Sequence, residues 1–327
     1  MSELLEIKDL NKIYPLKKSL FKKSKDFVPA LNGITFQIHK GEVLGLVGES
    51  GSGKSTCGKI LVRLQKASSG SVLYRGKNIN ELSGKSLKTY RKKAQMIFQD
   101  PYESLNPRRT IFDTLVEPLN VQHMGDITEK EEKIKEVLEK VELRPAEEFM
   151  YRYPHELSGG QRQRISIARA LVVEPEFIVA DEPISMLDAS VRASFMNLML
   201  KLKEDFDLTY LFITHDLAYA RYICDRLAVI YLGELVEIGP TERVIQEPIH
   251  PYTQMLLSAV PVPDPSFKRK RIERDVHAGH SGGCAGCKFS SRCPIAIQDK
   301  CPGTHKGKPD LVPIEDGRYV ACHRLIH

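Results

Sequence analysis

The sequence predicts an α/β fold built on a parallel sheet, preceded by a small antiparallel β layer. Two observations lead to this prediction. Short continuous apolar runs at residues 43–47, 177–180 and 211–213 are typical of parallel strands that are buried on both faces. Apolar and polar residues alternate at 5–10 and 34–38, as they do in half-buried antiparallel strands. Helical stretches separate the later strands, which is the order of an α/β core.

A helical insertion is expected from about residue 82 to residue 157, because this part reads mostly as helix. Within it, a heavily charged stretch carries Ile134, Val137, Leu138 and Val141 at helical spacing on one face.

The C-terminal part has a different composition. After Gly239-Pro240 the chain becomes rich in proline and then basic, which indicates a linker into a small Cys-rich tail. We therefore expect two units, residues 1–240 with the helical insertion inside it, and residues 241–327 as a C-terminal extension.

Composition limits the class of protein. The chain has 327 residues and a formal net charge of +6, a mild excess that argues only weakly for anionic partners. It contains no run of about 18 apolar residues, and its first residues lack the layout of a signal peptide. A cytosolic chain is expected. Five of the seven cysteines lie in the tail, and in a reducing compartment such a cluster favours metal binding over disulfides.

A phosphate-binding loop organises the chain. The stretch Gly48-Glu49-Ser50-Gly51-Ser52-Gly53-Lys54-Ser55-Thr56 follows the apolar run 43–47 and fits the pattern G-x-x-x-x-G-K-[ST]. Its glycines bring backbone N–H groups against phosphate oxygens, and the following helix adds its positive end. Lys54 can then reach the β- and γ-phosphates, and Ser55 has the hydroxyl that usually holds Mg²⁺. A nucleoside triphosphate site is predicted, the alternative being a Gly/Ser-rich surface turn.

Acidic residues follow the next buried strand. Asp181 and Glu182 come directly after the run 177–180 and are expected at the carboxyl edge of the sheet, beside the phosphate loop. One carboxylate can hold Mg²⁺, and the other can polarise an attacking water, as phosphoryl hydrolysis requires. His215 also ends a strand, where it can contact the γ-phosphate or serve only as a surface histidine.

A second anion-binding helix start is predicted at Ser158-Gly159-Gly160-Gln161. Ser158 is a good N-cap, and the glycines expose backbone N–H groups. This stretch has no lysine and no strand before it, so we expect it to complete the site of a partner molecule across a symmetric interface. The alternative is a helix start with a flexible cap.

Taken in chain order, these motifs resemble the ATP-binding cassette of ABC transporters over residues 5 to about 240. The residues that carry the resemblance are the phosphate loop, Gln99, Leu157 to Gln161, Asp181-Glu182, Leu187-Asp188 and His215. The resemblance implies an ABC-type ATPase core that binds ATP and Mg²⁺. In that family Gln99 senses Mg²⁺, Asp181 serves the metal, Glu182 is the catalytic base and His215 the γ-phosphate switch. Tyr14 lies where the family stacks an aromatic on adenine, although it can also be a packing residue.

A narrower resemblance covers nearly the whole chain. Residues 99–108 and His250-Pro251-Tyr252-Thr253 are similar to the ATPase subunits of dipeptide and oligopeptide importers, and residues 53–58 are most similar to the second, F-type, subunit. Met186 departs from the Ala common in that family. The resemblance implies a peripheral ATPase on the cytoplasmic face of the membrane. It would pair with a second ATPase and two permease subunits, serve a substrate-binding protein indirectly, and bind no nucleic acid. Nickel and glutathione are related cargoes.

The cysteines of the tail resemble a motif that holds an iron–sulfur cluster in some members. By this resemblance Cys287, Cys293, Cys301 and Cys322 are the expected ligands of a [4Fe–4S] cluster, with Cys284 as a spare thiol. Zinc is the direct alternative, and reduced thiols without a metal are another.

Two functions from other classes were weighed. A soluble ABC-type machine acting on nucleic acid commonly has a long coiled coil or two cassettes, whereas this sequence has one cassette and no sustained heptads. A redox or iron–sulfur carrier would leave the ATP motifs unexplained.

Overall fold

The structure is a computed structural model that describes residues 2–15, 27–259, 286–297, 301, 307–315 and 317–325. Residues 260–285, which hold the later part of the proline-rich linker and Cys284, lie outside the described residues.

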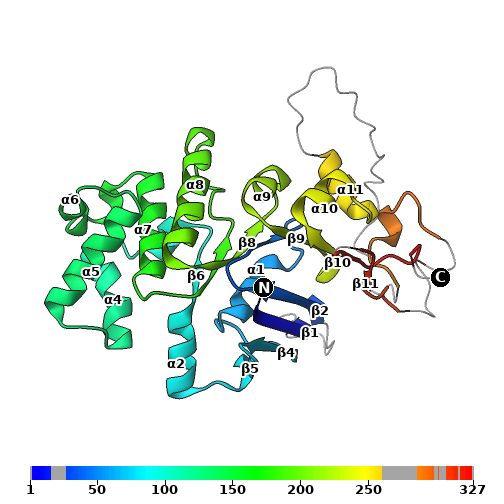
Figure 1. The fold of residues 1–327 in the computed structure, drawn as a ribbon, viewed down its shortest axis with the longest axis horizontal. Helices are drawn as coiled ribbons and strands as arrows, with labels where there is room; N and C mark the ends of the chain where they lie inside the picture. The colour runs from blue at the N-terminus through cyan, green and yellow to red at the C-terminus, as the bar shows by residue number, and fades with distance from the viewer. Residues whose placement is uncertain are drawn as a thin grey trace, which may run out of the picture.

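Two sheets form the centre of the molecule (Figure 1). The four-stranded antiparallel sheet has the order β2-β1-β4-β5. Its strands are β1 (Glu3–Pro15), β2 (Phe27–His39), β4 (Ser69–Tyr74) and β5 (Lys77–Asn78). The eight-stranded sheet has the order β11-β12-β10-β9-β3-β8-β7-β6. Its strands are β3 (Val43–Val47), β6 (Ala94–Ile97), β7 (Phe177–Asp181), β8 (Thr209–Thr214), β9 (Arg226–Tyr231), β10 (Glu234–Pro240), β11 (Val312–Pro313) and β12 (Tyr319–Val320).

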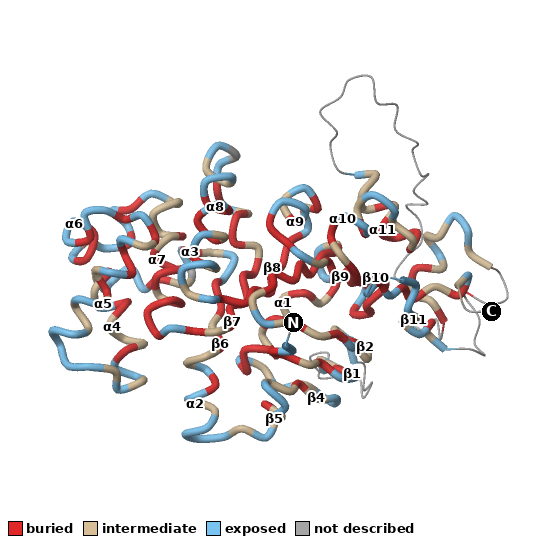
Figure 2. Tube along the Cα trace, viewed as in Figure 1, coloured by how far each residue is buried: buried red, intermediate tan, exposed pale blue. Residues whose placement is uncertain are grey.

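The central strands of the larger sheet are parallel and buried on both faces, as the apolar runs predicted. Strands β9, β3, β8, β7 and β6 pair in parallel, and every residue of β3, β7 and β8 is buried. Alternate residues enter opposite cores: Val43 and Val47 belong to one hydrophobic cluster, Leu44 and Leu46 to the other. Figure 2 shows this buried zone running through the strands.

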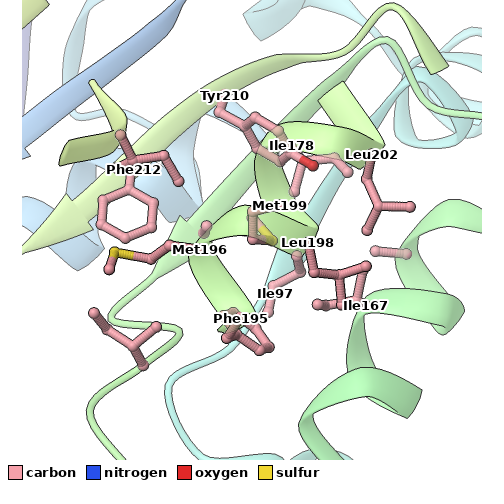
Figure 3. Close-up of a cluster of buried hydrophobic side chains, with 14 of the residues drawn as sticks. Ile97, Ile167, Ile178, Phe195, Met196, Leu198, Met199, Leu202, Tyr210 and Phe212 are labelled. Carbon is pink, nitrogen blue, oxygen red and sulfur yellow. The ribbon is translucent and has the colours of Figure 1, made fainter. Parts of the chain in front are cut away.

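One of the two cores lies between strands β6 to β8 and helices α7 (Gly159–Leu171) and α8 (Ala189–Phe206). Figure 3 shows part of it, in which Met199 and Leu202 of α8 lie near Tyr210 and Ile178 of the sheet, and Phe195 lies near Ile97. Helix α1 and the antiparallel sheet contribute to the other core, through Cys57, Ile60 and the inward residues of β1 and β2.

The described helices surround these sheets. They are α1 (Lys54–Leu61), α2 (Gly84–Lys93), α3 (Pro101–Ser104), α4 (Ile111–Gln122), α5 (Ile127–Lys140), α6 (Ala146–Met150), α7 (Gly159–Leu171), α8 (Ala189–Phe206), α9 (Leu217–Ile223), α10 (Thr241–Gln246) and α11 (Pro251–Ser258). Short 3₁₀ helices are η1 (Ile79–Glu81), η2 (Pro154–Glu156) and η3 (Ser290–Arg292). No helix in the described ranges is long and apolar enough to cross a membrane.

Helices α2 to α6 lie within the region of residues 82–157 that was predicted to be mostly helical. Helices α4 to α7 gather at one end of the molecule (Figure 1), and Ile134, Val137 and Leu138 are the buried residues of α5. One element differs, because residues 94–97 form β6, the edge strand of the parallel sheet. The strand is only four residues long and contains the polar Gln95, so the sequence shows no continuous apolar run there.

The C-terminal residues dock on the main sheet. We call the described residues from 286 onward the tail. Strand β12 of the tail pairs antiparallel with β10, and β11 pairs with β12 (Figure 1). A buried ion pair supports this docking: Arg318 Nη2 lies 2.6 Å from Glu237 Oε1, with side-chain exposures of 3% and 0%.

We expect Arg318→Ala to destabilise the docked strand β12 by about 3–5 kcal/mol, because the Glu237 carboxylate would stay buried without its counter-ion. Amide hydrogen exchange at Ala321, whose N–H donates to the carbonyl of Val236, measures this opening. Arg324→Ala is the matched control, since Arg324 donates to the carbonyl oxygen of Ile295 in an exposed contact. Equal exchange rates in the two variants would contradict a structural role for the buried pair.

Candidate functional site

The phosphate loop connects β3 to α1, and close backbone contacts require two of its glycines. A Cβ atom at Gly48 would lie 2.2 Å from the carbonyl oxygen of Ile230, and one at Gly53 would lie 2.3 Å from that of Ala30. Gly53 also has a φ of 104°, a conformation that residues with a side chain rarely adopt. The glycine pattern of the sequence is therefore explained by the packing of the loop against β9 and β2.

The lysine of the loop points into it. Lys54 is 5% exposed, and its Nζ donates to the carbonyl oxygens of Gly48 and Glu49 at 2.8 Å each. Burial lowers the pKa of Lys54, and the carboxylates of Glu182, Asp181 and Glu49 oppose that lowering. The ammonium is thus held at the centre of the loop among acidic groups.

Two of the three predicted magnesium ligands, Ser55 and Asp181, lie side by side. Ser55 Oγ donates to Asp181 Oδ1 at 2.9 Å, joining the start of α1 to the end of β7. Burial raises the pKa of Asp181, while the hydrogen bond from Ser55 and the positive charge of Lys59 lower it. Mg²⁺ prefers oxygen ligands and is usually held by one or two carboxylates together with the substrate phosphates, so this hydroxyl and carboxylate fit such an ion.

The parallel sheet brings three further predicted residues together. Gln99 follows β6, Glu182 follows β7 and His215 follows β8. Gln99 Nε2 donates to Glu182 Oε2 at 3.2 Å, and His215 Nδ1 lies 3.2 Å from Glu182 Oε1. The backbone of Glu182 has a φ of 46°, an uncommon conformation for a residue with a side chain, and its N–H donates to the carbonyl of Ile213. Such local strain is typical of functional positions.

The second predicted anion site forms the start of α7. Ser158 Oγ accepts from the N–H of Gln161 at 3.3 Å, and Gln161 Oε1 accepts from the N–H of Ser158 at 2.9 Å, which is a capping box. Gly159 has open space where a Cβ would be placed. Figure 1 places α7 in the helical cluster, whereas α1 lies over the sheets. Completion of a partner's site by this helix start stays a prediction.

Two predicted residues lie apart from these contacts. Asp188 is the exposed N-cap of α8 and makes no side-chain capping bond. Tyr14 lies at the end of β1, where its hydroxyl donates to Gln65 Oε1 and Lys12 Nζ lies 5.0 Å from its ring centre. Its stacking on adenine stays a prediction.

Two residues that were not predicted as site residues contact the phosphate loop. Tyr252 of α11 accepts a hydrogen bond from the N–H of Glu49 at 2.9 Å, and Arg292 of the tail forms an ion pair with the Glu49 carboxylate at 2.9 Å. Tyr252 lies in the stretch His250 to Thr253, which was used only as a family marker. Nothing local in the sequence indicates a role for Arg292.

The iron–sulfur prediction is wrong. Among the described residues, which include the four proposed ligands Cys287, Cys293, Cys301 and Cys322 but not Cys284, no group of three or more His, Cys, Asp or Glu side chains is placed to hold a metal ion. The described cysteines are free thiols. Burial is the largest cause raising the pKa of Cys287, to about 12, and it also raises the pKa of Cys293 and Cys322.

A segment as short as the tail can bury little hydrophobic core by itself, and metal cross-links are one way to stabilise such a segment. Phe289 of the tail is instead 1% exposed and packs against Tyr231 and Tyr252, with ring centres 5.3 and 5.5 Å apart. The main sheet and α11 therefore supply the core that the tail lacks alone.

Comparison with known proteins agrees with this geometry. The family model described as "ABC transporter" matches residues 31–185, and the model described as "Oligopeptide/dipeptide transporter, C-terminal region" matches residues 236–301. The oligopeptide transport ATP-binding protein AppF of Bacillus subtilis (strain 168) is 46% identical over 325 residues, covering 98% of this chain and 97% of AppF. The chain belongs to the ABC transporter family of ATP-binding proteins. Within that family it is similar to members with an oligopeptide-type C-terminal region.

Further relatives of this ABC protein agree in sequence and in fold. OppF of Bacillus subtilis (strain 168), an oligopeptide transport ATP-binding protein, is 50% identical over 310 residues, covering 88% of this chain and 98% of OppF. The ATP-binding cassette MJ0796, solved as a dimer bound to ADP and Pi, superimposes with a TM-score of 0.63 and 31% identity over 72% of this chain and 98% of that one. CbiO1 from Clostridium perfringens has a TM-score of 0.64 at 26% identity, over 76% of this chain and 92% of its own.

These comparisons confirm the prediction of an ABC-type ATPase, its α/β fold and its resemblance to the peptide-importer group. They do not favour the nucleic-acid alternative. The division at residue 240 and the description of residues 241–327 as a separate Cys-rich extension stay predictions.

Proposed function

We propose that this chain is the ATP-hydrolysing subunit of an importer for dipeptides or oligopeptides. The observation that carries the proposal is similarity to an oligopeptide transport ATP-binding protein along 98% of the chain, including the C-terminal region. Nickel or glutathione import is a weaker candidate, because the relatives described above are named for oligopeptides.

In this proposal the chain works at the cytoplasmic face of the membrane as a peripheral subunit. It pairs with a second ATPase, which is either another copy or a different chain, and the pair drives two permease subunits that receive cargo from a binding protein. Dimerisation is supported by the MJ0796 cassette, which was solved as a dimer.

We assign the roles within the site as follows. The backbone N–H groups of residues 48–56 and the start of α1 bind the phosphates, and Lys54 neutralises their charge. Ser55, Asp181 and Gln99 hold Mg²⁺, which when bound neutralises charge on the phosphate oxygens. Glu182 accepts the proton of the attacking water.

The remaining residues of the site position the carboxylate base and the nucleotide. His215 lies against Glu182, where it can hold that carboxylate in place and contact the γ-phosphate. Ser158 to Gln161, together with Asp188, serve the nucleotide held by the partner subunit, and Tyr14 stacks on the adenine.

Loss of the phosphate-loop lysine tests the proposed function. We expect Lys54→Ala to weaken ATP binding on the order of 10- to 100-fold, because a charge-assisted contact to phosphate is removed. In cells whose own copy is replaced by the Lys54→Ala variant, uptake of a labelled dipeptide and tripeptide should fall to background. Uptake of labelled nickel and of labelled glutathione, measured in the same cells, shows which of the three cargoes depends on this chain. Peptide uptake that is unaffected while one of the other two is lost would overturn the peptide assignment.

A further inference from the structure

An arginine of the tail is directly bonded to the phosphate loop. Arg292 Nη2 lies 2.9 Å from Glu49 Oε1, and Arg292 Nη1 lies 2.9 Å from Glu49 Oε2, so the guanidinium and the carboxylate face each other with two parallel hydrogen bonds. This bidentate geometry is the strongest and most directional form of an ion pair. The two residues are separated by 243 positions in the sequence.

The guanidinium is held in place by aromatic rings. Its central carbon lies 5.7 Å from the ring centre of Tyr231 and 5.8 Å from that of Phe289. Tyr231 ends β9, next to the phosphate loop, and Phe289 anchors the tail in the core. The arginine therefore bridges a rigid part of the tail and a rigid part of the ATPase sheet, and it is preorganised for its contact with Glu49.

Several contacts tether Glu49. Its N–H donates to Tyr252 Oη, its carbonyl oxygen accepts from Lys54 Nζ, and its carboxylate binds Arg292. Tyr252 is fully buried, so its hydroxyl is a fixed acceptor. The contacts of Tyr252 and Arg292 come from elements C-terminal to residue 250, and they fix the backbone and the side chain of the same loop residue.

The negative charge of Glu49 affects Lys54 inside the site. Its carboxylate is one of the three that raise the pKa of Lys54 against the effect of burial. A carboxylate at this place also repels the phosphates of a nucleotide that the loop binds, unless a cation compensates it. Arg292 supplies that compensation.

We propose that Arg292 is a positioning residue for the phosphate loop, and that docking of the tail thereby sets the affinity for ATP. The inference rests on the proposed ATP site and adds a regulatory contact to it. The tail acts through Glu49 in two ways: it fixes the position of the loop, and it neutralises a negative charge beside the phosphates.

The test is a double-mutant cycle on the full-length chain, read as ATP affinity by equilibrium titration. We expect Arg292→Ala to weaken ATP binding about three- to tenfold, as expected for loss of a half-exposed ion pair that also contacts aromatic rings. Arg292→Lys should give an intermediate affinity, because lysine keeps the charge and loses the bidentate contact. In a Glu49→Gln background, Arg292→Ala should cause no further loss, since the carboxylate that needs compensation is absent.

Controls separate this inference from the proposed site. Arg324→Ala removes another tail arginine, one that contacts the carbonyl of Ile295, and should leave ATP affinity unchanged. An equal loss from Arg292→Ala in both Glu49 backgrounds, or no loss at all, would overturn the inference. If Lys54→Ala still weakened ATP binding on the order of 10- to 100-fold in that case, the ATP site would stand without the tail contact. Full binding by Lys54→Ala would instead reject the ATP site itself.

Discussion

We expect Glu182→Gln to bind ATP like the wild type and to hydrolyse it roughly 10²-fold more slowly or worse, because the variant lacks the base that takes the proton of the attacking water. Glutamine keeps the shape of the side chain. It also keeps an oxygen that can accept from Gln99 Nε2, which lies 3.2 Å from the carboxylate in the native chain. Steady-state phosphate release gives the turnover, and titration with ATP gives the affinity.

The matched control is Glu242→Gln. Glu242 lies at the surface of α10, and its carboxylate pairs with Arg221 at 2.9 Å. The Glu242→Gln variant shows how the loss of one surface carboxylate changes turnover and ATP affinity. Wild-type turnover in Glu182→Gln would refute the base assignment. A parallel loss of ATP affinity would show that Glu182 acts in binding instead.

The second large effect is expected from Gly159→Asp, and it should appear in the partner subunit. Within the part of the chain that the structure describes, no heavy atom lies within 4 Å of a Cβ placed at Gly159, so the new side chain has room there. In a closed dimer its carboxylate would face the γ-phosphate held by the other subunit and repel it. We expect the rate of hydrolysis at that subunit's phosphate loop to fall by at least about tenfold. This is the size of effect expected when a favourable contact to phosphate is removed. Gly159→Asn, which is nearly isosteric and uncharged, should have a smaller effect.

In a dimer of two copies of this chain, pairs of variants show whether Gly159 acts at the nucleotide site of the partner or at that of its own chain. With Lys54→Ala in one copy and Gly159→Asp in the other, both defects fall on one composite site and the second site stays intact. With both changes in the same copy, each composite site carries one defect and activity is lost. The reverse result would show that the start of α7 serves the nucleotide of its own chain.

Most of the phosphate loop could be predicted because its chemistry is local. The glycines, Lys54 and Ser55 act within one continuous stretch, and the apolar run before it indicates a buried strand. The same holds for α5, whose buried face follows directly from the spacing of Ile134, Val137 and Leu138. Strand β6 was missed because four residues that include a glutamine give too short a pattern.

The tail shows where local evidence misleads. Closely spaced cysteines and few large apolar residues indicate a metal-bound unit when the segment is considered alone. The segment instead docks on the main sheet through β12, with Phe289 buried among aromatic residues and Arg318 paired with Glu237. Whether a thiol is a ligand or a packing group depends on its burial and on its neighbours, which composition does not contain.

The sequence by itself determined the motifs: the phosphate loop, the acidic pair after β7 and the capped start of α7. Only the tertiary structure decided which of them meet. The order β3-β8-β7-β6 in the sheet brings Gln99, Glu182 and His215 together, and docking of the tail brings Arg292 to Glu49. The reason is physical, because periodicity and turn chemistry act over a few residues, whereas contacts between distant residues depend on how strands pair and which faces are buried.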